Sequence, residues 1–574
     1  MQIIETPPMD QPAGPRVWQL VAVILLTLGW LIPGGIKPWT VFLRESSISG
    51  LSLLFCWALV LVLRIKDAFK VSPLVLCALA LALTPLVQWG FGLISVRGGA
   101  WITCAYLAGF ALSIGSGALA DRAEAGMMQD TLFAAIGLTA LVTVGLQGYQ
   151  SVYPGDGTGI WVAYTLPTRL AGNFNQSNHT ATFLLWGVCA TAWLWLRGAI
   201  KAWLAIFLSL IFLTGVSWTV SRTAWLGLGL MLAGSWYWRA LWPDRRAPWV
   251  VVALCAYFFV VPYLHPSAGA SAVLVSTGSS LQRLDIWHVA INALNLQPWF
   301  GYGWGQIFSA QLAVAAQIPQ LHAPMISAHN LVLDVLLSCG ILLGGLVLCA
   351  GAFWLWLCLQ AVKQPQDALM VIFVLVVLNH AMLEYPLFYA YMLIPFGLVL
   401  GALDVRLSPW ELPAFKVSKS AWISALCLVT LLWGLIVKDY LDYQESFQDL
   451  VLHRVGVVTD PWQAPRAILL NQLGALLELE ELDSKRTGRS LEELQFFESI
   501  ATLSPVGTAQ LVLAGSWAMH GDPERARWWL SRFCSVYIDT ACGVAQNNWK
   551  KAWGAHPEIS AISWPDSNTK PDKP

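Results

Sequence analysis

The chain has 574 residues, of which 57% are hydrophobic and only 11% are charged, and its formal net charge is zero. Soluble globular proteins have roughly 25% charged residues, so we expect the lipid bilayer rather than water to surround most of this chain. The zero net charge gives no general attraction to polyanions, and the sequence predicts no nucleic-acid partner.

Apolar runs of about 18 residues or more recur along the chain, and each is long enough to cross a hydrocarbon core about 30 Å thick. They lack the alternation of β-barrel strands, so we predict helices, which satisfy their own backbone groups in lipid. The first run, from about Trp18 to Gly34, has no signal-cleavage site after it and should remain as a span.

The fold class that we predict is an all-α polytopic membrane protein with about thirteen transmembrane helices. Their approximate limits are 17–35, 50–64, 71–89, 100–120, 130–148, 178–196, 201–217, 221–238, 248–264, 328–359, 367–381, 383–404 and 420–437. The tenth is too long for one ordinary span, so it begins as a helix above the membrane or contains a break near Gly340 to Gly345.

The distribution of Lys and Arg predicts the orientation. With the N-terminus inside, the inside segments hold fourteen Lys and Arg residues and the outside loops hold six, as the positive-inside rule requires. Residues 1–16 are then cytoplasmic, and 17–437 form a transmembrane domain with a large outside loop at about 265–326. The odd number of spans places a small helical domain, 438–574, outside.

This outside tail differs in composition from the rest of the chain. Leu476 to Leu482 and Leu491 to Glu498 are Glu-rich helical patterns, and Asp522-Pro523-Glu524 is typical of a helix start. No clean 34-residue period of helix-pair repeats is visible. Cys534 and Cys542 lie in this tail, where an oxidising compartment would permit a disulfide, although sequence alone does not fix their geometry.

Polar side chains gather where predicted spans meet the outside. The first such segment is Arg169-Leu-Ala-Gly-Asn173-Phe-Asn175-Gln176-Ser-Asn178-His179, which leads directly into a span. One Asn or Ser suffices to cap a helix, whereas this segment has three Asn, a Gln and a His. We therefore predict a functional role for it beyond capping.

A second outside segment is Ser221-Arg222, at the start of the eighth span. With Ser221 as the N-cap, Arg222 lies in the first turn, where a cation opposes the helix dipole. An Arg that snorkels to the interface would explain this simply. An anion held between Arg222 and the helix N-terminus would also reconcile an outside cation with the dipole.

The outside loop at 265–326 contains one amphipathic helix, which we expect to start at a Ser280 cap and to lie on the membrane. Its apolar face carries Leu281, Leu284, Trp287, Ile291 and Leu294. Arg283 is the only Lys or Arg of the loop. The helix should stop before Pro298, and Gly301-Tyr-Gly303-Trp-Gly305 should form a tight turn.

The loop ends with Ser327-Ala-His329-Asn330, which opens the tenth span. With Ser327 as the cap, His329 lies in the first turn, where the dipole favours the neutral imidazole that a general base needs. A buried, hydrogen-bonded histidine is the structural alternative. Glu384 and Tyr385 lie in a further outside hairpin, and Glu384 can serve there simply as an ion-pair partner of an outside arginine.

Other chemistries fit this sequence poorly. His179, His322, His329 and His380 are possible ligands, but no Cys-x-x-Cys or His-Glu-x-x-His spacing supports a metal, and we predict none. There is no Gly-x-Ser-x-Gly elbow for a serine hydrolase. The glycine-rich turn lacks the Lys-Ser/Thr of a nucleotide loop, so we expect no cofactor.

From Gly172 the chain reads Gly-Asn-Phe-Asn-Gln-Ser-Asn-His-Thr-Ala-Thr-Phe-Leu-Leu. This segment resembles the signature of protein O-oligosaccharyltransferases, the pilin glycosylation ligases, except that Ser177 stands where that branch has Pro. Arg222 in Ser-Arg-Thr-Ala-Trp, Arg283 in Arg-Leu-Asp-Ile-Trp and His329 in Ser-Ala-His-Asn resemble the core of the wider O-antigen ligase/polymerase superfamily. The resemblance covers roughly 165–405.

The resemblance implies a glycosyltransferase of the bacterial inner membrane, with the outside being the periplasm. The donor is an oligosaccharide on undecaprenyl diphosphate, and the acceptor is a hydroxyl of a pilin-like or other periplasmic protein. It implies His329 as the base, Gln176 and Tyr385 as further catalytic residues, and arginines rather than a metal to stabilise the leaving diphosphate. The residues that we expect to bind substrate are Arg222, Arg283, Arg169, Asn173, Asn178, His179 and Glu384.

Three alternatives remain. Within the superfamily, an O-antigen ligase would use a lipid A–core sugar as acceptor, and an O-antigen polymerase would use another lipid-linked repeat unit. A transporter of lipid-linked glycan is the alternative of another class, but transporters place ionisable residues near the bilayer midplane. Here the polar groups lie on one face. The tail is a candidate for acceptor recognition because of its predicted location.

Overall fold

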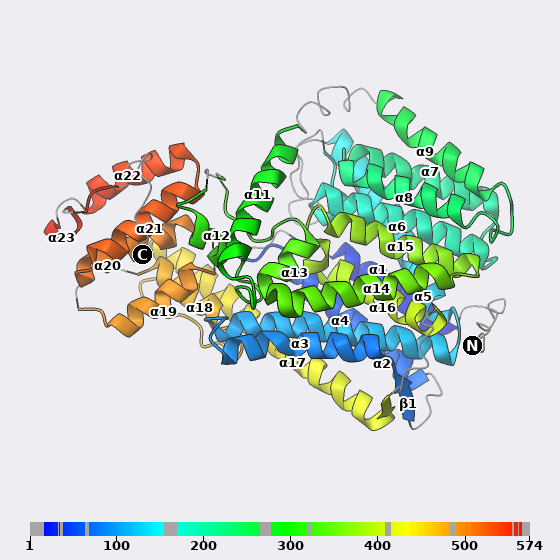
Figure 1. Ribbon diagram of the computed structural model, residues 1–574, viewed down its shortest axis with the longest axis horizontal. Coiled ribbons are helices and arrows are strands. Elements are labelled where there is room, and N and C mark those ends of the chain that lie inside the picture. Colours follow the sequence, from blue (N-terminus) through cyan, green and yellow to red (C-terminus); the bar gives the residue numbers. More distant parts are fainter. Residues whose placement is uncertain are drawn as a thin grey trace. The chain divides into compact units, whose positions relative to one another are not determined.

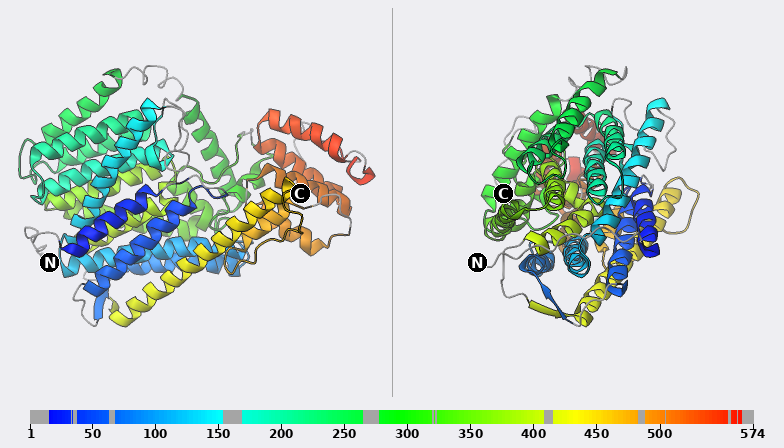
Figure 2. Two further views of the ribbon diagram at one scale, coloured as in Figure 1. Left: turned by 180° about the vertical axis from the view of Figure 1, so that it is seen from behind. Right: turned by 90° about the vertical axis from the view of Figure 1, so that its right-hand side faces the viewer.

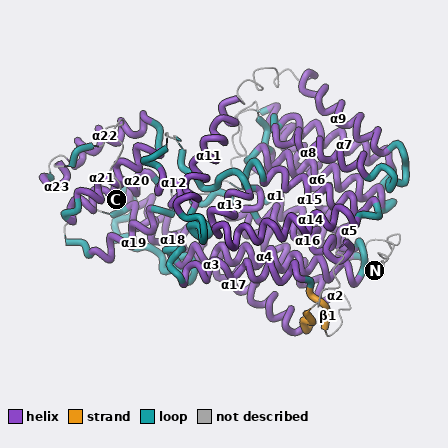
Figure 3. The backbone as a smooth tube through the Cα atoms, viewed as in Figure 1, coloured by secondary structure: helices purple, strands orange, loops and turns teal. Residues whose placement is uncertain are grey.

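The computed structural model describes residues 16–32, 34, 38–62, 68–153, 169–264, 277–318, 321, 323–407, 415–482, 488–503, 505–553, 556–560 and 562–564. The predicted cytoplasmic segment before residue 16, the first part of the 265–326 loop and the candidate ligand His322 lie outside these residues. Most of the described chain is helical, as Figure 3 shows.

Long helices follow one another along the chain as far as residue 454 (Figure 1). Their bounds are α1 Val17–Leu31, α2 Phe42–Val62, α3 Pro73–Gly90, α4 Arg97–Ala123, α5 Met127–Val152, α6 Ser177–Leu196, α7 Ala202–Trp218, α8 Arg222–Tyr237, α9 Ala247–Leu264, α11 Thr277–Leu296, α12 Ile307–Val314, α13 Leu331–Cys339, α14 Gly345–Ala361, α15 Pro365–Ala381, α16 Ala390–Leu407 and α17 Lys419–Arg454.

Eight helical segments among the described residues are long and apolar enough to cross a membrane: α2 to α6, the run from α13 to α14, α16 and α17. Four more, α1, α7, α9 and α15, are apolar but shorter. The protein is therefore an all-α polytopic membrane protein, as the composition predicted. The count of thirteen spans stays a prediction.

The long tenth run contains the predicted break. Helix α13 ends at Cys339, and a five-residue π-helix, η3 Gly340–Gly344, leads into α14. Gly340 has φ +69°, and a Cβ there would lie 2.1 Å from the Trp299 carbonyl oxygen. The amide of Tyr302 donates to the Leu337 carbonyl at 2.7 Å. The break therefore leaves backbone carbonyls without their helical hydrogen bonds. Amides of the glycine-rich turn donate to these carbonyls instead.

One element was not predicted. Strands β1 Ala68–Val71 and β2 Phe415–Ser418 form a two-stranded antiparallel sheet, in which Ala68 pairs with Ser418. The two strands come from segments that the Lys and Arg distribution assigns to the inside.

The chain divides into two compact units. Unit 1 comprises 1–82, 105–277 and 350–433, and unit 2 comprises 83–104, 278–349 and 434–574. In unit 1, helix α6 packs against α5, α7, α8 and α15. The long helices of this unit lie side by side (Figure 2). Trp186 of α6 is fully buried and stacks on Phe373 of α15 at 4.2 Å between ring centroids. This packing holds α6 in place within unit 1, and with it the residues at the start of the helix.

Unit 2 holds the tail. Its helices are α18 Asn471–Glu480, α19 Leu491–Ala501, α20 Gly507–His520, α21 Pro523–Val536, α22 Asp539–Trp553 and α23 Pro557–Ser560.

Two features of the tail that the sequence indicated are present. The predicted helix start at Asp522 is confirmed, since its side chain accepts from the Arg525 amide at 2.9 Å. Cys534 and Cys542 form a disulfide. Helix α17 continues without interruption through residues 437 and 438, so no change of secondary structure marks the predicted start of the tail domain.

Candidate active site

The predicted polar segment before α6 folds into a compact entry to that helix. A short 3₁₀ turn, η1 Gly172–Phe174, is followed by Asn175 in the left-handed region at φ +59°. Gln176 is the N-cap, and its Oε1 accepts from the His179 amide at 2.8 Å. The cap uses one of the polar side chains, so the others are available for different contacts.

Glu384 joins this segment to the turn after α15. Its Oε2 accepts from Gln176 Nε2 at 2.7 Å, and its Oε1 accepts from Asn178 Nδ2 at 2.5 Å. Arg169 Nη2 in turn donates to Asn178 Oδ1 at 3.4 Å. Glu384 is 7% exposed, so a buried carboxylate holds two of the predicted site residues in place. These contacts assign to Glu384 partners that the sequence did not suggest.

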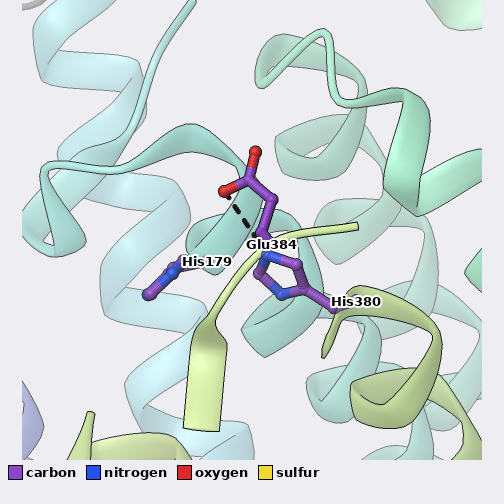
Figure 4. A group of neighbouring side chains, drawn as sticks. All are labelled: His179, His380 and Glu384. Atoms are coloured by element: carbon purple, nitrogen blue, oxygen red, sulfur yellow. Dashed lines mark ion pairs between the residues drawn. The ribbon is translucent and has the colours of Figure 1, made fainter. Parts of the chain in front are cut away.

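Two buried histidines complete the cluster, as Figure 4 shows. His380 Nε2 lies 3.9 Å from Glu384 Oε2, and His380 Nδ1 lies 2.9 Å from the Thr182 hydroxyl. His179 Nδ1 is hydrogen bonded to the Tyr391 hydroxyl. Among the described residues, the Nε2 atoms of both histidines have no hydrogen-bond partner. Both rings are thus oriented through Nδ1.

His179, His380 and Glu384 form a metal-type donor set that the sequence did not predict, because His179 is distant in the sequence from His380 and Glu384. One ring nitrogen of each histidine and a Glu384 oxygen lie within 4.8 Å of one another. Ligands of a tetrahedral zinc ion, at about 2.1 Å from the metal, lie roughly 3.4 Å apart. Both carboxylate oxygens already accept amide hydrogens. The geometry is therefore that of a hydrogen-bonded cluster more than of a preformed metal site.

The surroundings of Glu384 favour its charged form. Burial alone would raise the pKa of this carboxyl, but the His380 imidazole and the Gln176 amide stabilise the carboxylate, and the net effect lowers the pKa well below its ordinary value. Glu384 is thus ionised at neutral pH, and we expect it to orient neighbours rather than to exchange protons.

We expect Glu384→Gln to lower the unfolding free energy by about 1–3 kcal/mol, because one amide donor then faces another donor. The lowered pKa of Glu384 gives a stabilisation that is complete above its ordinary pKa of about 4.3 and is lost as the pH falls through the lowered value. The difference between the thermal unfolding midpoints of the wild type and Glu384→Gln should be constant from about pH 6 to 8 and should shrink below about pH 4.

The exposed Glu558→Gln is the matched control and should leave the midpoint unchanged. An unchanged midpoint for Glu384→Gln would show that the carboxylate contributes nothing to the cluster.

Asn173 and Tyr385 make further contacts that are not part of the hydrogen-bonded cluster. Asn173 is fully buried; its Nδ2 donates to the Trp30 carbonyl at 2.9 Å, and its Oδ1 accepts from the Thr143 hydroxyl at 2.9 Å. These bonds anchor the segment, while its role in substrate binding stays a prediction. Tyr385 is half-buried, and its ring packs against that of Phe388 at 5.6 Å between centroids.

Arg222 is the first residue of α8, as predicted, and its N-cap is Ser221. The Ser221 side chain makes no capping hydrogen bond, although its backbone has the extended conformation of a cap. The N-terminal amides of α8 are therefore not occupied by the Ser221 hydroxyl, which is consistent with an anion near Arg222.

The prediction that His329 lies in the first turn of a helix was wrong. Asn330 is the N-cap of α13, and its side chain accepts from the Val332 and Leu333 amides at 3.0 and 3.2 Å. His329 precedes the cap, with φ +53°. The Ser327 hydroxyl, three residues earlier, instead accepts from the His329 amide at 2.9 Å and donates to Asp334 at 2.7 Å. The dipole therefore acts on His329 less directly than expected.

The predicted Ser280 cap was also wrong, since α11 already begins at Thr277. The end of the helix before Pro298 is confirmed, and Gly301, Gly303 and Gly305 all have positive φ, as a tight turn requires. Leu284 and Ile291, on the predicted membrane face, are exposed. Arg283 is half-buried on this helix.

Sequence comparison identifies the relatives of this chain. Residues 171–195 match the family model of a protein glycosylation ligase, 204–350 match O-antigen ligase, and 368–551 match the C-terminal part of a virulence factor membrane-bound polymerase. A general O-oligosaccharyltransferase of Acinetobacter baylyi is 30% identical over 479 residues, which cover 79% of this chain and 81% of that protein.

A ComP-specific O-oligosaccharyltransferase of the same organism is 25% identical over 258 residues, which cover 44% of this chain and 47% of that protein. No solved structure matches the chain.

A mainly helical membrane protein with these family matches is a membrane-embedded glycosyltransferase. The chain belongs to the O-oligosaccharyltransferases of the O-antigen ligase superfamily. The resemblance that the sequence motifs indicated is confirmed, and the matches extend beyond residue 405 into the tail.

Proposed function

We propose that this protein transfers an oligosaccharide en bloc from undecaprenyl diphosphate to a Ser or Thr hydroxyl of a pilin-like periplasmic protein. The observation that carries the choice of a protein acceptor is the segment at 171–195. It matches a protein glycosylation ligase, and it is the segment whose Gln176 and Asn178 are held by Glu384. The name of the 30% identical relative supports the same choice.

In the mechanism that we propose, His329 removes the proton of the acceptor hydroxyl, and the oxygen attacks the anomeric carbon of the donor sugar. The bond from that carbon to the diphosphate oxygen breaks, and undecaprenyl diphosphate leaves. Arg222 and Arg283 neutralise the leaving diphosphate, because planar guanidinium groups match phosphate oxygens. No metal ion is required for this step.

Gln176 is well suited to orient a substrate. Its Oε1 accepts from the His179 amide and its Nε2 donates to Glu384, so both ends of the side chain are fixed. An amide retains a second lone pair and a second N–H after these two bonds. We propose that these remaining sites, together with the Tyr385 hydroxyl, contact the reacting sugar.

We also propose that the protein crosses the bacterial inner membrane thirteen times, with a cytoplasmic N-terminus and residues 438–574 in the periplasm. The Lys and Arg distribution supports this orientation. The disulfide between Cys534 and Cys542 supports an oxidising compartment for the tail.

Intact-mass spectrometry of a pilin-like protein, co-expressed with this enzyme and a lipid-linked glycan, tests the proposal. We expect a mass shift equal to the whole oligosaccharide, and transfer in membranes that persists in EDTA. Loss of transfer in EDTA, with recovery on addition of zinc, would refute metal independence and point to the His179, His380 and Glu384 cluster.

A second candidate acceptor is supported by the matches at 204–350 and 368–551, whose families are an O-antigen ligase and a polymerase. Lipopolysaccharide from the same cells distinguishes it. An unshifted pilin beside newly capped or lengthened lipopolysaccharide would contradict the protein acceptor and leave the proposed donor chemistry in place.

A further inference from the structure

The segment from Ala323 to Met325, which leads to His329, is held by a buried side chain of α12. Gln311 is 3% exposed; its Nε2 donates to the Ala323 carbonyl at 2.9 Å, and its Oε1 accepts from the Met325 amide at 2.7 Å. Met325 is also buried. Since a buried backbone group without a partner is costly, Gln311 fixes the path of the segment from Ala323 to Met325.

A second buried side chain holds Ser327 and Ala328, and through Ser327 the amide of His329. Asp334 of α13 accepts from the Ser327 hydroxyl at 2.7 Å and from the Ala328 amide at 2.6 Å, and Ser327 accepts from the His329 amide at 2.9 Å. His329 itself adopts φ +53°, which is uncommon for a residue other than glycine. Such a conformation persists where the surroundings impose it, and these bonds do so.

Helix α12 is itself part of the hydrophobic core of the tail. Phe308 and Leu312 of α12 are 2% and 1% exposed and belong to the same core cluster as Trp517 and Trp529. Arg532 of α21 donates from Nε to the Leu312 carbonyl at 2.9 Å. Arg532 is 4% exposed, and its guanidinium lies 4.8 Å from the ring centroid of Trp528.

We propose that the tail positions the base: helices α18 to α23 hold α12, and Gln311 of α12 holds the segment that leads to His329. Gln311 and Arg532 are then positioning residues for transfer. This assignment rests on the proposed role of His329 as the base. The tail thus affects transfer by holding the segment that leads to His329, whether or not it also contacts the acceptor. Deletion of 439–574 would expose Phe308 and Leu312 and cannot separate these roles, so point variants are needed.

The variant Gln311→Leu removes both hydrogen bonds and nearly keeps the side-chain volume. We expect kcat for transfer in the full-length protein to fall at least about tenfold, because small displacements of a catalytic group are costly, while the KM for the lipid-linked donor stays the same. Gln317→Leu, at an exposed position in the turn after α12, is the matched control and should keep the wild-type kcat.

Arg532→Met and Arg532→Lys form a second pair. Met keeps an apolar stem beside Trp528 but cannot donate to the Leu312 carbonyl, whereas Lys restores a donor. We expect kcat to fall with Met and to recover with Lys at equal thermal unfolding midpoints, which a loss of folding alone would not produce. This pair decides the question if Gln311→Leu fails to yield folded protein.

The possible outcomes are distinct. Wild-type kcat in folded Gln311→Leu, or in folded Arg532→Met, overturns the positioning role and leaves the proposed function standing if His329→Ala is inactive. Full activity of folded His329→Ala overturns the proposed base and the positioning role together. A rise in KM with unchanged kcat would assign these residues to binding and also overturn the inference.

Discussion

His329→Ala is expected to reduce glycan transfer by about 10²–10⁴-fold, the usual contribution of a general base. Without the imidazole, the acceptor hydroxyl must attack with its proton still bound. The enzyme should still insert into the membrane and bind the donor, because Ser327, Asn330 and Asp334 retain their hydrogen bonds. The measurement is the rate of transfer from lipid-linked glycan to the acceptor protein by purified enzyme in detergent or nanodiscs.

The backbone of residue 329 requires a second variant. At φ +53° an alanine is strained, whereas asparagine tolerates the left-handed region better. His329→Asn should therefore fold as the wild type does and still be inactive. His288→Ala, at an exposed histidine of α11, should leave the rate unchanged. A folded His329→Asn enzyme with the wild-type rate would eliminate His329 as the base.

Arg222→Ala is expected to lower kcat by about 10²–10³-fold, the cost of removing one donor that stabilises developing charge. Arg222 begins α8, so its guanidinium and the N-terminal amides of that helix favour the same anion. Arg222→Lys should recover only part of the rate, because a Lys ammonium is a point charge without the fork that suits two phosphate oxygens.

Single-turnover transfer with saturating donor measures this effect on the chemical step. Arg245→Ala, at an exposed arginine after α8, is the control for a change in net charge. Equal rates for Arg222→Ala and wild type would remove Arg222 from the donor site.

The sequence by itself determined most of the secondary structure. Apolar runs about as long as a bilayer is thick have one solution in lipid, the helix, so composition alone predicted the fold class. Local signals also sufficed for features that depend on only a few neighbouring residues. The break at Gly340, the turn at Gly301 to Gly305 and the helix start at Asp522 all appear as predicted. The motifs around His179, Arg222 and His329 sufficed for the family.

Local signals failed where two residues compete for one role. Ser327 and Asn330 both qualify as caps before α13, and the choice of Asn330 moved His329 out of the helix. Likewise, Ser280 lies inside α11 because the helix extends a turn further toward the N-terminus than its apolar pattern suggests. Propensities rank such candidates by a few tenths of a kcal/mol, roughly, which tertiary contacts easily exceed.

Only the tertiary structure decided the partners of buried polar groups. Glu384 meets Gln176 and Asn178, and Gln311 holds the segment before His329, across separations that no periodicity encodes. The sequence indicated only that carboxylates beside apolar runs, such as Glu384 and Asp334, must find partners, and it did not identify those partners. Buried polar groups must all be satisfied at once, and that condition applies to the whole fold rather than to any single segment.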